Sequence, residues 1–185
     1  MSDAPPEVED ETTNPESDAA PEVEEVTPDP DSAAGLLGRY LNGAAVLRDA
    51  IDGLDDGALR AHPIAGKMSS LEVIAHIVDS DQFMCDRMKR TIGTERPLLI
   101  GVESADYPEP LHYHDRDPEL DIQLLEIQRQ QMAATLKRQP AAARERTAVH
   151  SEIGLLTMWD LFIHATEHLE AHAESIAEKR EALGL

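Results

Sequence analysis

Three histidines spaced four residues apart, His164, His168 and His172, are the side chains of this sequence best suited to chemistry. On a helix, residues four apart lie on the same face, so the three imidazoles form one column. Neutral imidazole is a common ligand for zinc, nickel and iron. One ion cannot bind all three, because His164 and His172 would be roughly 12 Å apart along a helix axis, whereas metal–nitrogen bonds are about 2.0–2.1 Å long. The column therefore offers one adjacent pair, either the first two or the last two, and a further ligand must come from elsewhere.

The candidate for that further ligand is His76, the only histidine within the second long helix that the sequence predicts. It lies beside that helix's apolar stripe, and helical bundles commonly build metal sites from inward side chains on facing helices. Three protein ligands leave a fourth position open, which is the pattern of a catalytic metal site. The competing interpretation is that the column faces solvent and pairs with the glutamates of its own helix. The pattern argues against a zincin protease, because Ala165 and Leu169, not glutamate, follow the first two histidines.

Four long amphipathic helices are expected to position these side chains. Apolar residues that recur at intervals of three and four predict helices over residues 34–51, 69–92, 117–139 and 157–183, with one or two further turns at 54–61. In the third of these helices, the predicted inner face comprises Leu120, Leu124, Leu125, Ile127, Met132 and Leu136.

Local sequence also marks where three of the helices begin. Ser69 and Glu72 have the spacing of a capping box. Asp117 followed by Pro118 is typical of an N-cap and the first helical position. Thr157 opens the last helix, with an acidic residue three positions on as a weaker box.

Two long connections, residues 93–116 and 140–156, separate the helices. A connection of this length in a compact domain usually crosses the molecule or covers a site. The connections hold His112, His114 and His150, which are candidates to line a pocket. No segment shows sustained strand alternation. The sequence therefore predicts an all-α four-helix bundle with an up-down-down-up path, in which a long connection joins opposite ends.

Composition narrows the class of function. A length of 185 residues favours one domain with an appendage. The net charge of −21 argues against binding to nucleic acid, which requires a basic surface. The single cysteine, Cys85, fits a reducing compartment, and we find neither a signal peptide nor an apolar run long enough to cross a membrane. A cytoplasmic protein is expected.

Residues 1–32 differ from the rest of the chain. They contain twelve acidic residues, no lysine or arginine, and six of the twelve prolines. Such a segment buries too little apolar surface to offset the entropy lost on ordering, so we predict a disordered acidic tail. Without it, residues 33–185 carry a net charge of −9 and are expected to form the bundle domain.

Two stretches resemble motifs of the DinB/YfiT-like superfamily. Residues 66–90, GKMSSLEVIAHIVDSDQFMCDRMKR, are similar to the family's second helix, which usually begins G-K-W-S and continues L-E-V-x-x-H. Residues 150–176, HSEIGLLTMWDLFIHATEHLEAHAESI, are similar to its last helix, with a G-x-L-T lead-in and a histidine-rich column. The resemblance covers nearly all of residues 34–183. It implies a four-helix bundle, often a homodimer, in which three histidines bind a divalent metal.

On this resemblance, His76 is the ligand from the second helix, and His168 and His172 are the pair from the last. His164 then becomes a pocket residue one turn before the pair.

The chain departs from the family's pattern at three positions. Met68 stands where the family usually has tryptophan, Ala171 where it often has a further histidine, and Ser175 where it often has glutamine. None of these departures removes a ligand, but Met68 and Ser175 could alter the pocket.

Other residues of the second predicted helix are weighed as possible members of the site. Asp79 is a candidate to orient a ligand, and Arg87 a candidate to hold an anionic cofactor in the pocket. For both residues, the alternative is a solvated helix surface. Asp81 is expected to be an exposed charge. Cys85 falls on the apolar stripe and is expected to be a small buried hydrophobe.

The resemblance implies a metal-dependent enzyme with a small-molecule substrate. The family includes thiol-dependent S-transferases, a thiol-dependent isomerase and members described only as hydrolases. Our first interpretation is an S-transferase in which a low-molecular-weight thiol binds the zinc, nickel or iron ion as thiolate. The alternatives are a hydrolase that activates water and a non-catalytic, stress-related metal-binding bundle that acts through dimerisation or its acidic tail. The sequence pattern identifies no catalytic residue beyond the predicted metal ligands.

Overall fold

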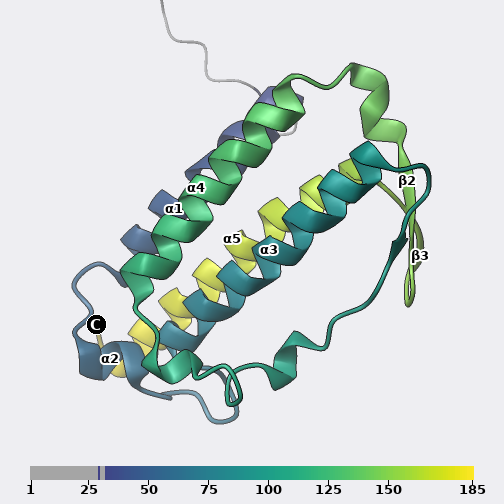
Figure 1. Ribbon diagram of the computed structural model, residues 1–185. Coiled ribbons are helices and arrows are strands. Elements are labelled where there is room, and N and C mark those ends of the chain that lie inside the picture. Colours follow the sequence, from purple (N-terminus) through teal and green to yellow (C-terminus); the bar gives the residue numbers. More distant parts are fainter. Residues whose placement is uncertain (1–28, 30–31) are drawn as a thin grey trace, which may run out of the picture.

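The long helices form a four-helix bundle (Figure 1). In this computed structural model, which describes residue 29 and residues 32–185, the elements of the bundle are α1 (Ala33–Ile51), α3 (Ser70–Gly93), α4 (Pro118–Lys137) and α5 (Met158–Leu183), with the short helix α2 (Asp56–Arg60) between the first two. The predicted four-helix bundle is confirmed. The predicted disorder of residues 1–32 concerns a segment that lies, except for residues 29 and 32, outside the described residues.

The helices follow the predicted up-down-down-up path. Helix α3 packs against α4 and α5, and α1 packs against the same two helices, so α1 and α3 lie across a diagonal. Figure 1 shows α3 and α4 running in the same direction, joined by a connection that returns along the length of the bundle. Two parallel neighbouring helices require such a return, which explains why the first connection is long.

Side-chain caps start the helices where the sequence predicts. The Ser69 hydroxyl accepts a hydrogen bond from the Glu72 backbone N–H at 3.1 Å, and the Glu72 carboxylate accepts one from the Ser69 N–H at 2.7 Å. Thr157 and Asp160 form the same reciprocal box at the start of α5. The Asp117 side chain caps the start of α4. Each box satisfies N–H groups that have no partner within the helix.

A small three-stranded sheet was not predicted. It comprises β1 (Leu98–Leu99), β2 (Thr147–His150) and β3 (Gly154–Thr157), in the order β1-β2-β3. Strand β1 is parallel to β2, and β2 is antiparallel to β3. These short strands add to the predicted helical bundle without changing its four-helix architecture. Strands of two to four residues are too short for alternation to be visible in the sequence, and the two connections that supply them meet only in the folded chain.

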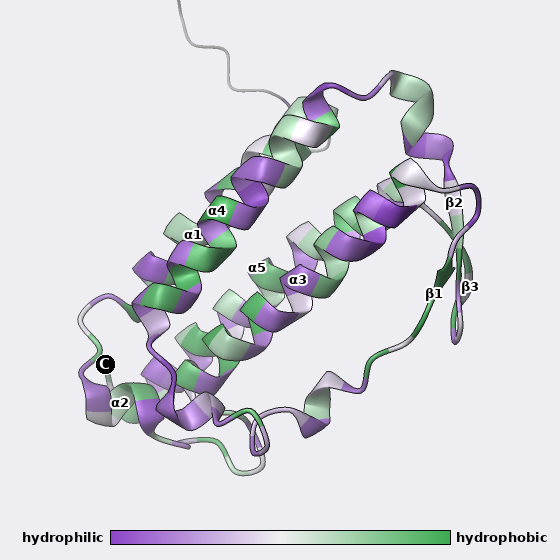
Figure 2. Ribbon diagram, in the orientation of Figure 1, coloured by the Kyte–Doolittle hydropathy of each residue, from purple (hydrophilic) through white to green (hydrophobic). Residues whose placement is uncertain are grey.

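The inner face of α4 is rotated from the predicted one. Leu125 and Met132 are buried as predicted, but two charged residues, Asp121 and Arg129, are buried beside them. Figure 2 shows apolar residues on the inner sides of the helices, with further apolar residues on the outer side of α4. Three predicted core residues are exposed and define the α4 outer face: Leu120, Leu124 and Ile127.

A buried ion pair explains this rotation. The Arg129 guanidinium lies 2.7 Å from the carboxylate of Asp81, which is only 3% exposed, so the prediction of a solvated charge at this aspartate is wrong. Arg129 also donates to the carbonyls of Tyr40 and Ala165, at 3.0 and 2.8 Å. It thereby links all four long helices. Gly43 makes room for it, because a Cβ there would lie 2.5 Å from an Arg129 nitrogen.

Candidate metal centre

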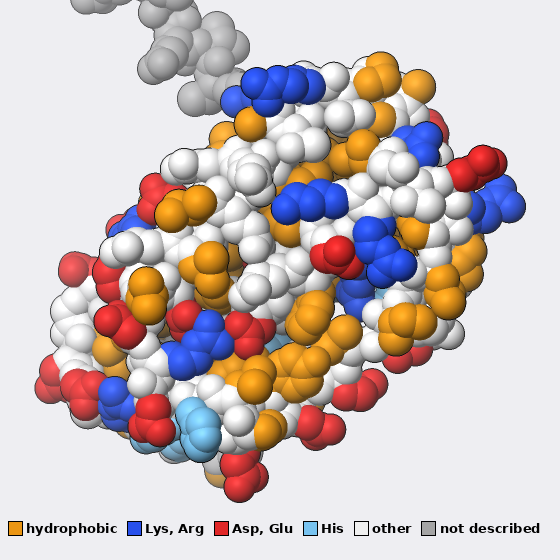
Figure 3. Space-filling view, in the orientation of Figure 1, with side chains coloured by type: hydrophobic (Ala, Val, Ile, Leu, Met, Phe, Trp, Pro, Cys, Tyr) orange, Lys and Arg blue, Asp and Glu red, His pale blue; other side chains and the backbone are white. Residues whose placement is uncertain are grey.

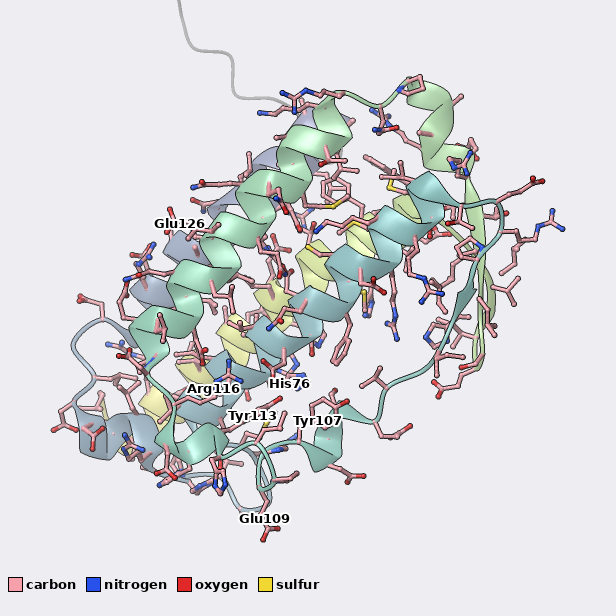
Figure 4. All side chains as sticks on the ribbon, in the orientation of Figure 1. His76, Tyr107, Glu109, Tyr113, Arg116 and Glu126 are labelled. Atoms are coloured by element: carbon pink, nitrogen blue, oxygen red, sulfur yellow. The ribbon has the colours of Figure 1, made fainter. Side chains whose placement is uncertain are left out.

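Three histidines from two helices meet between α3 and α5. One ring nitrogen of each of His76, His168 and His172 lies within 4.8 Å of the others. Their ring centroids are 5.3 Å apart for His76 and His168, 4.8 Å for His76 and His172, and 4.5 Å for His168 and His172. Figure 4 labels His76 on the part of α3 nearer to α2. The structure therefore brings together the three side chains that the family resemblance selected.

Local structure explains why the rings converge. The capping box at Ser69 begins α3 so that His76 follows in its second turn, on the side that faces α5. His168 and His172 stand one turn apart on α5, and the residue after each, Leu169 and Ala173, is buried in the core. The packed side of each helix thus holds the imidazoles at the rim of the core.

Burial makes these three side chains weak bases. Burial, followed by repulsion from the neighbouring imidazoles, lowers the pKa of His168 to about 3. Burial likewise lowers the pKa of His172 to about 4. Burial also lowers the pKa of His76, although the carboxylate of Asp79 partly opposes this effect. All three rings are therefore neutral at pH 7, which leaves their lone pairs free to bind a cation.

The Nδ1 atom of His76 is buried and has no hydrogen-bond partner among the described residues. Leaving a buried polar atom unpaired costs about 1–3 kcal/mol, and a bond to a metal ion would satisfy it. Three neutral imidazoles fit a transition-metal ion such as zinc, nickel or iron, because calcium and magnesium prefer oxygen ligands. The residues present therefore fit a divalent transition-metal ion.

A cavity of about 570 Å³ lies beside His168, between α3, α5 and the small sheet. Its polar lining includes Arg87, His150, Glu152 and His164, and its apolar lining includes side chains from both helices. A cavity of this size is within the range of small-molecule sites in proteins. One of the three clustered imidazoles thus forms part of the wall of a cavity large enough for a substrate.

Two of the predicted pocket residues, His164 on α5 and Arg87 on α3, line this cavity, whereas Asp79 does not. His164 is exposed, lies outside the three-histidine cluster, and has its ring centroid 5.7 Å from that of His168. Arg87 donates to the carbonyl of Ile100 at 2.9 Å, and burial lowers the pKa of its guanidinium. Cys85 is buried as predicted, and burial raises the pKa of its thiol to about 11, so it is not a nucleophile.

Asp79 holds a different position from the one first considered. Its carboxylate accepts hydrogen bonds from the Tyr113 hydroxyl at 2.8 Å and from Arg116 at 2.9 Å. No hydrogen bond joins it to the histidines within the described chain. Tyr113 is fully buried, and Figure 4 labels it close to Arg116 and His76. Asp79 therefore fastens the first long connection to α3 beside the histidine cluster.

Sequence reasoning missed both of these anchoring residues. Tyr113 lies between two of the histidines of the connection, and Arg116 directly precedes the cap of α4. Only the presence of an aromatic ring and a cation near the end of a long connection could have drawn attention to them. Of the three connection histidines, His150 lines the cavity, whereas His112 and His114 do not.

The sequence profile of the DinB superfamily matches residues 40–176. The chain belongs to the DinB superfamily. The matched residues include the three clustered histidines and the whole of both stretches on which the family resemblance was based. The predicted family assignment is therefore confirmed.

A solved structure shows the same DinB-type fold. YfiT from Bacillus subtilis superposes with a TM-score of 0.79 at 18% sequence identity, covering 86% of this chain and 91% of YfiT. It is described as "a probable metal-dependent hydrolase with an unusual four-helix bundle topology". At this identity, the likeness establishes a shared fold. Comparison with curated proteins finds no significant match.

Across the part of the chain that the structure describes, no helix has the length and hydropathy needed to span a membrane.

Proposed function

We propose that this protein binds one divalent transition-metal ion through His76, His168 and His172 and is a metal-dependent enzyme of the hydrolase type. The observation that carries the proposal is the convergence of three neutral imidazoles, one with an unsatisfied buried nitrogen and another on the wall of a cavity. Membership of the DinB superfamily and the description of YfiT support it.

A bound ion would supply Lewis acidity and lower the pKa of a coordinated water. The chain's own residues would hold that ion and orient the substrate beside it. The apolar walls of the cavity, which include Phe83 and Leu161, would exclude bulk water from the substrate. His164 would accept a proton at one of its ring nitrogens, a role supported by its position on the cavity wall next to His168.

Arg87 supports a substrate with an anionic group. Its guanidinium lines the cavity and has only one hydrogen bond to a backbone carbonyl and a long contact with Met84 among the described residues. A guanidinium has five N–H donors in a planar arrangement suited to carboxylate or phosphate. We propose that it positions such a group while the reacting bond lies nearer to His168.

Thiol-dependent transfer is the second candidate for the reaction. The same Arg87 would bind the carboxylate of a small anionic thiol, with its sulfur directed toward the histidine cluster. Activity assays separate the two candidates. The metal-loaded protein should turn over some members of a panel of small esters and amides without added thiol. Turnover of an electrophile only when a small thiol is present would favour transfer.

Metal content tests the site itself. We expect His168→Ala to lose one equivalent of bound metal per chain relative to wild type, measured by elemental analysis after gel filtration. His164→Ala is the matched control and should retain it, because this residue lies outside the cluster. Equal metal content in wild type and His168→Ala would contradict the site. Loss in His164→Ala combined with retention in His172→Ala would mean that the ligand pair is wrongly chosen.

We also propose that residues 33–185 form one domain, with residues 1–32 outside it, and that two copies of the domain associate. The α4 outer face supports association, because Leu120, Leu124 and Ile127 are exposed at helical spacing. Figure 3 shows hydrophobic side chains spaced along this side of the molecule.

A further inference from the structure

A second group of metal-ligating side chains lies one helical turn before His76. It consists of His62 from the loop after α2, Glu72 from the first turn of α3, and His114 from the short 3-10 helix η2 (Tyr113–Asp115). One donor atom from each lies within 4.8 Å of the others. The three residues come from separate segments of the chain, so only folding brings them together. Figure 3 shows histidine side chains gathered on the surface at this end of the molecule.

The His62 ring is oriented as metal-bound histidines usually are. Its Nδ1 lies 3.1 Å from the backbone carbonyl of Lys67. A carbonyl oxygen only accepts hydrogen bonds, so Nδ1 must carry the proton and donate it. In the neutral ring, Nε2 then holds the lone pair, and this atom faces the Glu72 carboxylate. A ligand histidine that donates its other N–H to a backbone carbonyl is a recurrent feature of metal sites.

The spacing of the donor atoms fits a bound ion better than a hydrogen bond. His62 Nε2 lies 3.6 Å from Glu72 Oε2, beyond hydrogen-bonding distance. Two atoms that each lie about 2.0–2.2 Å from a tetrahedral zinc ion are about 3.4 Å apart. Two lone pairs that face each other repel unless a metal ion or the proton of a charged imidazole lies between them. The His114 ring stands nearly parallel to that of His62, with the ring centroids 6.2 Å apart.

We propose that His62, Glu72 and His114 form a second divalent-cation site, with zinc as the preferred ion. Two imidazoles and one carboxylate are an established zinc donor set, which leaves a fourth position for water. Glu72 can serve both the capping box and the ion, because a carboxylate has about four lone-pair sites. The site shares no ligand with His76, His168 and His172, so it does not depend on the proposed function.

An ion at this site would tie the first long connection to α3. His114 belongs to that connection, whereas Glu72 belongs to α3 and His62 to the loop before it. The neighbouring Tyr113 already anchors the connection through Asp79. The second ion would therefore attach the connection to α3 at an additional point, beside the histidine cluster. The connection would be held more firmly when zinc is available.

Zinc titration of the full chain tests the proposal. We use the His168→Ala background to remove the first site, and isothermal titration calorimetry with zinc chloride as the probe. The His168→Ala protein should bind one zinc ion per chain, and the His168→Ala, His114→Ala protein none at the same concentrations. The matched control adds His112→Asn, which is exposed, lies outside the cluster and tolerates the positive φ of 52° at that position. It should retain the ion. Equal zinc binding with and without His114 would overturn the site.

A second variant separates ligation from folding. Glu72→Gln preserves capping-box chemistry but removes the charged ligand. In the His168→Ala background, it should weaken zinc binding more than about tenfold while the far-UV circular dichroism stays unchanged. Unchanged zinc affinity would contradict a role for Glu72 as a ligand.

Hydrogen exchange tests the fastening. At a free zinc concentration ten times the dissociation constant, amides of residues 111–116 in the His168→Ala protein should exchange about tenfold more slowly. Exchange that does not respond to zinc would overturn the fastening role.

Zinc stoichiometry distinguishes failure of this proposal from failure of the proposed function. A decrease in bound zinc from wild type to His168→Ala reports on the first site, and a further decrease on adding His114→Ala reports on the second.

Discussion

At the scale of single residues, burial decides the chemistry of this protein. The same imidazole that would be half protonated near neutral pH in an exposed position is held neutral at His168 and His172, because the charged form is poorly solvated there. Because protons bind weakly to these rings, they compete little with a metal ion for the imidazole lone pairs. In the metal-free protein, the same burial lowers the stability of the fold at acidic pH.

The metal-free protein should lose stability as the pH falls from about 6.5 toward 4. Unfolded histidines have a pKa of about 6.5, whereas burial lowers the pKa of His168 to about 3 and that of His172 to about 4 in the folded chain. The unfolded chain therefore binds protons first, which favours unfolding. Urea unfolding at several pH values checks this. The pH dependence should be weaker in His168→Ala than in His164→Ala, and equal slopes would contradict the explanation.

Asp81→Ala should destabilise the fold by about 3–5 kcal/mol, because it leaves the Arg129 guanidinium buried without its counter-ion. Urea denaturation measures the free energy of unfolding. Asp86→Ala on the same helix is the control. Its surface pair with Arg90 is exposed, so the change should be less than about 1 kcal/mol. Similar losses in the two variants would argue against the buried pair as a structural centre.

At the scale of elements, the first long connection is the part of the fold with a double role. It contributes β1 to the sheet beside the cavity and, further along, the anchor that Tyr113 makes with Asp79. Helices α3 and α4 run parallel, so the chain has to return along the bundle. That return places the connection over the end of α3 that carries His76.

Tyr113→Phe should loosen the connection with little effect on the rest of the bundle. The variant removes one hydrogen bond to Asp79, worth about 0.5–3 kcal/mol, while keeping the buried ring. Amides of residues 107–116 should exchange faster, and those at the centre of α5 should not change. Tyr107→Phe, whose ring packs on Phe83, is the control. Equal effects of the two variants would contradict the anchor.

At the scale of the whole molecule, the rotation of α4 leaves an apolar stripe outside. Burial of Arg129 and Asp121 turns Leu120, Leu124 and Ile127 outward, although the sequence pattern predicts them inside. Exposed apolar side chains at helical spacing are typical of surfaces that pair with another protein. A second copy of the chain is the occupant that we propose.

Ile127→Lys should convert a wild-type dimer into a monomer, because a charged residue at the centre of an apolar interface is costly to bury. Ile127 is 66% exposed in the single chain, so the fold should tolerate the change. Sedimentation velocity measures the oligomeric state. Leu185→Lys, a similarly exposed position at the chain end, is the control and should remain dimeric. A monomeric wild type would contradict the proposed association.

Much of the candidate site could be predicted because its information is local. Helical spacing puts His168 and His172 side by side, and capping residues fix where α3 and α5 begin. The family resemblance then chose between the two possible pairs on α5. The inner face of α4 could not be predicted in the same way, because hydropathy treats Arg129 as a surface residue and contains no information about its partner Asp81.

The sequence by itself determined the four helices, their starts and the histidines that they carry, because each depends on residues within about one helical turn. The tertiary structure alone decided the small sheet, the Arg129–Asp81 pair and the group formed by His62, Glu72 and His114. Each of these joins segments far apart in the chain. Their proximity arises only when packing sets the rotation of the helices and the route of the connections.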